Sequence, residues 1–194
     1  PSPKKRIIYA PHFSIADPQD PQALYIGTFL QFGEKILEYA QRFSNETQWA
    51  FKPHPCLKRE LIKQWGAGRT DEYFNKWAQL DNAQYAEGQY LDLFKHSDAI
   101  IHDCSSFICE YMFMQKPALF LHNGHDTTFN HLAQAALQQH YHATECQHIE
   151  EFIANVISGN DTLHDQRKAF FEQSLLPPNG KSAAENIIDA ILGQ

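Results

Sequence analysis

Short apolar runs alternate with longer amphipathic stretches along the whole chain. Residues 6–10, 48–51 and 99–102 are short, apolar runs rich in branched or aromatic side chains, which is typical of buried strands. Residues 23–43 instead carry apolar side chains at helical spacing. Strands that alternate with helices predict βαβ units, and therefore an α/β fold with a parallel sheet flanked by helices.

The other expected elements continue this alternation. Pro11 ends the first strand and opens a loop that reaches residue 21, and Thr70 or Asp71 is expected to cap a helix. A chain of 194 residues fits one domain of this kind. Further strands are expected at 84–87 and 117–121, and further helices at 56–65, 70–80, 90–95, 107–115, 130–138, 149–157, 162–174 and 182–192.

Charge and cysteine usage narrow the class of function. The formal net charge of −7 provides no general basic field for nucleic acid or an anionic membrane, so a phosphate must be bound locally. The four cysteines form no CxxC pair and are expected to be reduced thiols of a cytoplasmic protein. No apolar run approaches the roughly 20 residues of a membrane span. The start at Pro1, without Met, leads us to expect a segment excised from a longer protein.

The strongest chemical signal is segment 97–111, SDAIIHDCSSFICEY, in which a buried strand turns directly into a helix. The backbone N–H groups of Ser105 and Ser106 are expected at the helix N-terminus, where free donors and the helix dipole favour an anion. Glu110 follows about one turn later, where its carboxylate can accept hydrogen bonds from a ribose diol. The alternative interpretation is that Asp103 and Ser105 only cap the helix.

A second signal is the sequence Lys52-Pro53-His54-Pro55, in which two prolines restrict the backbone around one imidazole. A rigid His54 can stabilise charge on a phosphoryl oxygen or act as an acid toward a leaving group. Lys52 adds a point charge. The alternative is an ordinary loop histidine that bonds to the backbone.

A third polar loop, residues 10–14, follows the first strand and carries His12. All three loops are expected at the carboxyl ends of parallel strands, which is the edge where such sheets bind ligands. The histidine clusters at 122–125 and 140–142 match neither HExxH nor a spaced Cys/His set, so no metal site is expected. The chain also lacks a GxSxG elbow and a GxxxxGK[ST] loop.

These motifs resemble those of the CDP-glycerol glycerophosphotransferase family. SDAIIHDCSSFICEYMFMQKPALFL is similar to a family segment that reads roughly SDxLITDYSSxxxEYxxxxKPxxF, and KPHP and RIIYAPHF also have counterparts in the same order. Residues 179–191 resemble the family's closing helix. The chain departs from the family at His102-Asp103-Cys104, where the family has Thr-Asp-Tyr, and at Ser14, where the family has arginine.

The resemblance implies a Rossmann-like domain, the C-terminal half of a GT-B glycosyltransferase-type architecture, with residues 1–194 forming one domain that binds a CDP-linked donor. The implied reaction is attack by an acceptor hydroxyl on the glycerol-bearing phosphate, with release of CMP. No cofactor and no metal are implied. The implied catalytic residues are His54 and His12, and the implied donor-binding residues are Lys52, His102, Asp103, Ser105, Ser106 and Glu110.

The implied acceptor is a growing bacterial surface polysaccharide or a glycolipid. The resemblance also implies an N-terminal acceptor domain outside this segment, and peripheral attachment of the full-length enzyme to the cytoplasmic face of the membrane. Two alternatives stay open. One is a UDP-sugar-dependent GT-B glycosyltransferase or epimerase, and the other is a catalytically inactive module for nucleotide binding or assembly.

Overall fold

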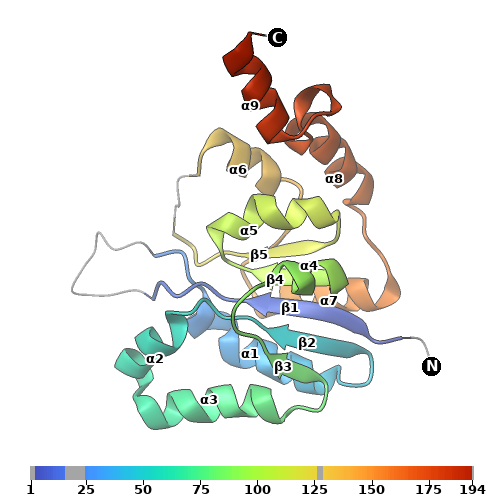
Figure 1. Cartoon of the computed structure of the whole chain (residues 1–194). Helices are drawn as coiled ribbons and strands as arrows, with labels where there is room; N and C mark the ends of the chain where they lie inside the picture. The colour runs from blue at the N-terminus through green and yellow to red at the C-terminus, as the bar shows by residue number, and fades with distance from the viewer. Residues whose placement is uncertain (1–2, 16–24, 126–128, 194) are drawn as a thin grey trace.

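The computed structural model describes residues 3–15, 25–125 and 129–193. In this part of the chain, a six-stranded parallel sheet has the order β3-β2-β1-β4-β5-β6, and helices pack around it (Figure 1). The expected α/β fold with a parallel sheet is confirmed. The strands are β1 (Lys5–Ala10), β2 (Thr47–Phe51), β3 (Ala83–Tyr85), β4 (Ala99–His102), β5 (Ala118–Leu121) and β6 (Tyr141–Ala143).

The connections place polar loops at one edge of the sheet. The strand order reverses between β1 and β4, which is the point where open α/β sheets form a ligand-binding crevice at their carboxyl ends. The helices are α1 (Phe29–Arg42), α2 (Leu57–Trp65), α3 (Ala67–Gln79), α4 (Leu91–His96), α5 (Ser105–Glu110), α6 (His131–Leu137), α7 (Cys146–Ser158), α8 (His164–Phe170) and α9 (Ala183–Leu192).

Each face of the sheet carries a hydrophobic core over its central strands, as expected for a parallel sheet. Ile7 and Tyr9 of β1 belong to a large core with residues of α1, α3 and α7, whereas Ile8 and Ala10 belong to a smaller core with α4 and α5. Alternate side chains of a strand point to opposite faces, so one apolar strand feeds both cores. In the larger core the rings of Phe51 and Trp77 are stacked, with centroids 4.9 Å apart.

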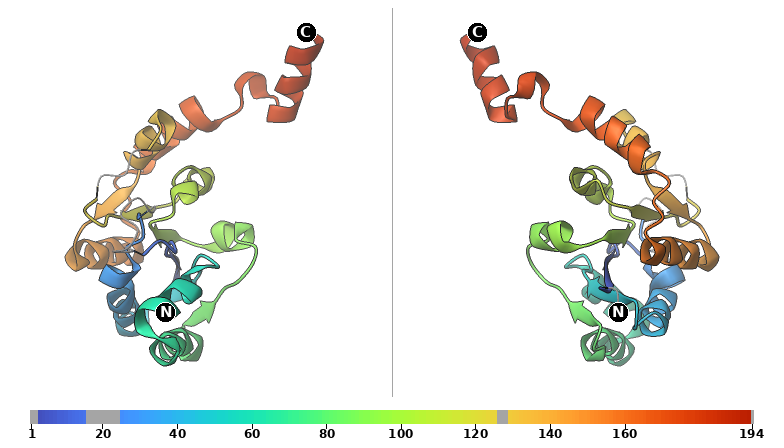
Figure 2. Two further views of the ribbon diagram at one scale, coloured as in Figure 1. Left: turned by 90° about the vertical axis from the view of Figure 1, so that its left-hand side faces the viewer. Right: turned by 90° about the vertical axis from the view of Figure 1, so that its right-hand side faces the viewer.

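The C-terminal segment extends away from the sheet (Figure 2). A π-helical turn, Phe171–Leu175, follows α8, and α9 begins with a capping box between Ser182 and Glu185. The apolar side chains of α9 remain exposed, with Ile191 at 77%. None of the described helices is long and apolar enough to cross a membrane.

Several boundaries differ from those expected. The helix expected at 70–80 begins at Ala67, so Thr70 lies inside it and donates its hydroxyl to the Gly66 carbonyl instead of capping the helix. The helix expected at 107–115 begins at Ser105 and ends in a 3-10 turn, Tyr111–Met114. The helix expected at 23–43 begins at Phe29, since residues 25–28 are described and are not helical. The expected loop 11–21 and the start of that helix fall partly on residues 16–24, outside the described residues.

Two buried histidines lie side by side beneath the carboxyl edge. The ring centroids of His102 and His140 are 5.4 Å apart. Each Nδ1 contacts a backbone carbonyl, which can only accept, so each ring donates from Nδ1 and leaves Nε2 without a partner in the described structure. Burial lowers the pKa of His140 to about 4 and lowers the pKa of His102 strongly. Both imidazoles are therefore neutral at physiological pH.

This pair predicts acid destabilisation. An unfolded histidine takes up its proton near pH 6.5, whereas folded His140 stays neutral down to about pH 4. The unfolded chain binds more protons between these values, so the free energy of unfolding should fall as the pH drops from about 6.5 to about 4. Urea denaturation across this range measures the slope.

The variant His140→Gln isolates the contribution of one imidazole, because every other titrating group is still present. It should show a shallower loss of stability with acid than the wild type, and an equal slope would contradict the account. The exposed His131 provides the matched control, as His131→Gln.

Candidate functional site

A cavity of about 290 Å³ opens among the loops that follow β1, β2 and β4. Five of the eight site residues predicted from the sequence line this cavity. Tyr90 lines it as well. The five are His12, Lys52, His54, Ser105 and Ser106.

Lys52 supplies a positive charge to this cavity. Lys52 is only 7% exposed, and its ammonium makes no salt bridge or hydrogen bond to another described residue. Burial lowers the pKa of Lys52, while nearby Cys104 and Glu87 act in the opposite direction. Glu87 influences Lys52 only at a distance, and no described carboxylate forms a salt bridge with the ammonium, so this charge is available to an anionic ligand in the cavity.

Ser105 and Ser106 add uncharged donors beside this cation. They are the first two residues of α5, whose N-cap, Cys104, makes no side-chain capping bond. Their backbone N–H groups have no acceptor among the described residues, and both residues are exposed. Ser105 and Ser106 therefore bring two free amides and two hydroxyls to the wall of the cavity, at the point where the chain leaves β4.

Backbone groups hold both the main chain and the ring of His54. Its backbone N–H donates to the Pro11 carbonyl at 3.0 Å, and the backbone N–H of Cys56 donates to the ring Nδ1 at 3.1 Å. Because Nδ1 accepts, the proton of the neutral ring is on Nε2. Burial lowers the pKa of His54, and the positive charge of Lys52 lowers it further.

His12 lies next to His54 in the cavity wall, with ring centroids 5.5 Å apart. Phe13 contacts both rings, at centroid distances of 4.5 Å each. Burial lowers the pKa of His12 to about 4, and the neighbouring His54 contributes to the shift. The cavity in its free state thus contains one cation and two neutral imidazoles.

Asp103 lies behind the cavity instead of lining it. Its completely buried carboxylate accepts three hydrogen bonds, from the N–H of His12 at 2.5 Å and from the N–H and hydroxyl of Thr28 at 2.6 and 2.8 Å. Burial raises the pKa of this carboxyl to about 6, against the lowering effect of these bonds. Asp103 therefore holds the His12 loop and the start of α1 against the end of β4.

The two remaining predicted residues also lie outside the cavity wall. His102 is fully buried under the turn, where Nδ1 contacts the Cys104 carbonyl. Glu110 is half-buried and accepts a 2.6 Å hydrogen bond from the hydroxyl of Tyr90, whose ring does line the cavity. No local sequence pattern indicates a role for Tyr90 or Thr28, because only the fold brings them to the segment that follows β4.

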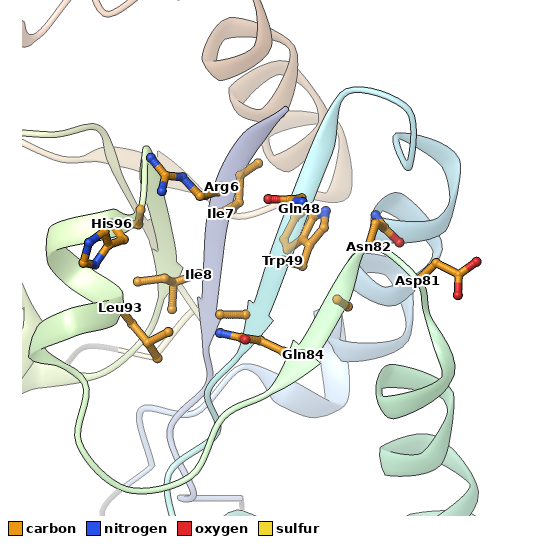
Figure 3. A pocket seen from close by; sticks show the side chains of 13 residues that line it. Arg6, Ile7, Ile8, Gln48, Trp49, Asp81, Asn82, Gln84, Leu93 and His96 are labelled. Carbon is orange, nitrogen blue, oxygen red and sulfur yellow. The ribbon is translucent and has the colours of Figure 1, made fainter. Parts of the chain in front are cut away.

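A second cavity of about 280 Å³ lies over the face of β1, β2 and β3, toward their amino ends (Figure 3). Uncharged Gln48 and Gln84 line it together with Arg6. The guanidinium of Arg6 already has a carboxylate neighbour, since its Nε lies 3.6 Å from Asp98. The cavity at the carboxyl ends is therefore the better candidate for an anionic ligand.

Two solved structures share this fold across the chain. The UDP-GlcNAc 2-epimerase from Neisseria meningitidis, bound to UDP-GlcNAc, is 18% identical with a TM-score of 0.59, and the match covers 100% of this chain and 45% of the epimerase. A variant of the wall teichoic acid polymerase TagF is 18% identical with a TM-score of 0.58, and the match covers 100% of this chain and 44% of TagF. At this identity the likeness establishes a Rossmann-like domain of the GT-B type, and the chain spans less than half the length of either protein.

The family comparison covers almost the whole sequence. No curated protein matches the chain. The family described as "CDP-Glycerol:Poly(glycerophosphate) glycerophosphotransferase" matches residues 1–193. The match includes all the loops that line the cavity at the carboxyl ends of the strands. The chain therefore belongs to the CDP-glycerol:poly(glycerophosphate) glycerophosphotransferase family of transferases.

Proposed function

We propose that this chain is the donor-binding domain of a transferase that uses a CDP-linked donor such as CDP-glycerol. The observation that carries the proposal is the ammonium of Lys52, which makes no hydrogen bond to a described residue and shares one cavity with the free amides of Ser105 and Ser106. Donors without a carboxylate partner suit a diphosphate, because each phosphate oxygen is an acceptor. The family supports glycerol phosphate as the transferred group.

In the proposed reaction, an acceptor hydroxyl oxygen attacks the phosphorus atom that bears the glycerol. A new P–O bond forms, the P–O bond to CMP breaks, and the electron pair leaves with the CMP phosphate. Lys52, the amides of Ser105 and Ser106, and the Nε2–H of His54 stabilise the charge that develops on the leaving phosphate. His12 assists as a second imidazole in the same wall.

The proton of the acceptor hydroxyl needs a base that this cavity does not provide. Lys52 is a cation, and His54 is protonated on Nε2 in its neutral form. The related structures are more than twice as long as this chain, which supports a base in another part of the full-length protein. His102 and Asp103 take part indirectly in this proposal, by shaping the turn that presents Ser105.

The nucleoside of the donor is assigned to the end of the cavity near Tyr90. The phenol of Tyr90 donates to Glu110, so this carboxylate lies next to a residue of the cavity wall, and in this proposal it accepts hydrogen bonds from the ribose hydroxyls. The rings of Tyr90 and Phe107, with centroids 5.0 Å apart, give this end an aromatic wall. A charged end and an aromatic end together suit a nucleoside diphosphate.

The acceptor in this proposal is a growing surface polymer of the cell envelope. Structural likeness to a wall teichoic acid polymerase supports such a polymer, and the full-length enzyme would extend it at the cytoplasmic face of the membrane. The likeness to an epimerase bound to UDP-GlcNAc supports a second candidate, a UDP-linked donor in the same cavity. Nucleotide preference separates the two candidates.

Removal of the Lys52 charge tests the binding proposal. Lys52→Met retains most of the apolar side chain but removes the ammonium, so the affinity for CDP should fall about 10- to 100-fold, as expected for the loss of a charged hydrogen bond. Isothermal titration calorimetry with CDP, CMP and UDP measures the change. The exposed Lys63, as Lys63→Met, is the matched control. Unchanged affinity in Lys52→Met would contradict the assignment of the cavity, and tighter binding of UDP than CDP would favour the second candidate.

Removal of the His54 imidazole tests the catalytic proposal. In the full-length enzyme, His54→Ala should lower kcat by about 100-fold or more, because a donor to the leaving phosphate is lost. His54→Gln should recover part of the activity, since its amide nitrogen can lie near the position of Nε2. Steady-state release of CMP is the measurement. Turnover close to the wild-type value in His54→Ala would remove this residue from the mechanism.

A further inference from the structure

The hydroxyl of Ser14 faces the ring of His12. Ser14 Oγ lies 2.9 Å from Nδ1 of His12, and the backbone N–H of Ser14 donates to the same nitrogen at 3.2 Å. Both residues are buried, at 5% and 8% exposure. The contact is therefore sheltered from solvent that could replace either partner.

Two backbone amides fix the direction of the Ser14 hydroxyl. The N–H groups of Ile26 and Gly27 each donate to Ser14 Oγ at 3.0 Å. A hydroxyl has two acceptor lone pairs and one hydrogen, so these two bonds leave the hydrogen to be donated. Among the described residues, Nδ1 of His12 lies within hydrogen-bonding distance to accept it, and the one lone pair of this nitrogen is shared with the backbone N–H of Ser14.

This arrangement decides where the proton of the neutral His12 ring lies. Because Nδ1 accepts, the ring carries its proton on Nε2, as His54 does. The backbone of His12 is also fixed, since its N–H donates to Asp103. Close packing reinforces the loop, because a Cβ on Gly27 would lie 2.2 Å from the Ser14 carbonyl oxygen.

We propose that Ser14 is a positioning residue that selects the Nε2–H tautomer of His12 and directs this donor into the cavity. The functional consequence of this tautomer rests on the proposed function. In that function, His12 donates a hydrogen bond to the diphosphate of the CDP-linked donor and does not act as a base. Ser14 itself, which is absent from the cavity wall, acts through the imidazole and touches no ligand.

The tautomer is measured directly in the unaltered protein. Long-range proton–nitrogen NMR correlations at about pH 8 distinguish the two neutral forms of a histidine ring, and His12→Gln assigns the signal. The expected spectrum shows His12 protonated on Nε2. A spectrum with the proton on Nδ1 would overturn the inference, whatever the protein binds.

A double-mutant cycle then measures the consequence for binding. Ser14→Ala should weaken CDP binding about tenfold in the wild type and should add nothing in a His12→Ala background, because Ser14 acts only through that ring. Ser14→Thr keeps the hydroxyl and should restore both the tautomer and the affinity. An equal loss from Ser14→Ala in both backgrounds would mean that Ser14 merely supports the loop, which would overturn the proposal.

The two measurements separate failure of this inference from failure of the proposed function. If the wild type binds no CDP while His12 shows the Nε2–H form, the donor assignment fails and the tautomer assignment stands. If the wild type binds CDP and the cycle shows no coupling between positions 14 and 12, the donor assignment stands and the role of Ser14 is refuted.

Discussion

The buried carboxylate of Asp103 is the constraint on which the candidate site depends. It joins three parts of the chain: the turn into α5, the loop after β1 through the N–H of His12, and the start of α1 through both donors of Thr28. A carboxylate out of contact with water is costly, and hydrogen bonds to fixed donors offset that cost. For Asp103 the effect of burial is larger than that of the hydrogen bonds, since the pKa of its carboxyl is raised to about 6. At neutral pH the group remains ionised and holds the two loops together.

Two cationic residues of the chain, Arg167 and Lys52, are almost entirely buried, and their surroundings differ. Arg167 is fully buried, but its guanidinium makes two hydrogen bonds to Asp161, at 2.7 and 3.1 Å, so its charge is balanced within the protein. Lys52 is almost as buried and has no such partner in the described structure. The Arg167–Asp161 pair is therefore consistent with a structural role, whereas Lys52 is available to bind an anionic ligand. Because the chain has a net charge of −7, its overall field does not attract anions, and an anion must be bound by local groups such as Lys52.

The sequence predicted the sheet and the shared position of the three loops, because parallel strands bring their carboxyl ends to one edge. The sequence could not show that His102 is buried away from the cavity. All four residues of β4 are buried, so the alternation of side chains along the strand does not separate buried from exposed positions. The strand β6 was missed because its sequence, Tyr141-His142-Ala143, lacks an apolar run. The bonds from Thr28 to Asp103 span 75 residues, so no local pattern indicates them.

A structure of the protein with CDP bound tests the central claim most directly. The account predicts that the diphosphate lies within hydrogen-bonding distance of Lys52 Nζ and of the backbone N–H groups of Ser105 and Ser106, with the nucleoside toward Tyr90. A nucleotide bound elsewhere, for example in the cavity lined by Gln48 and Gln84, with Lys52 still unpaired, would contradict it.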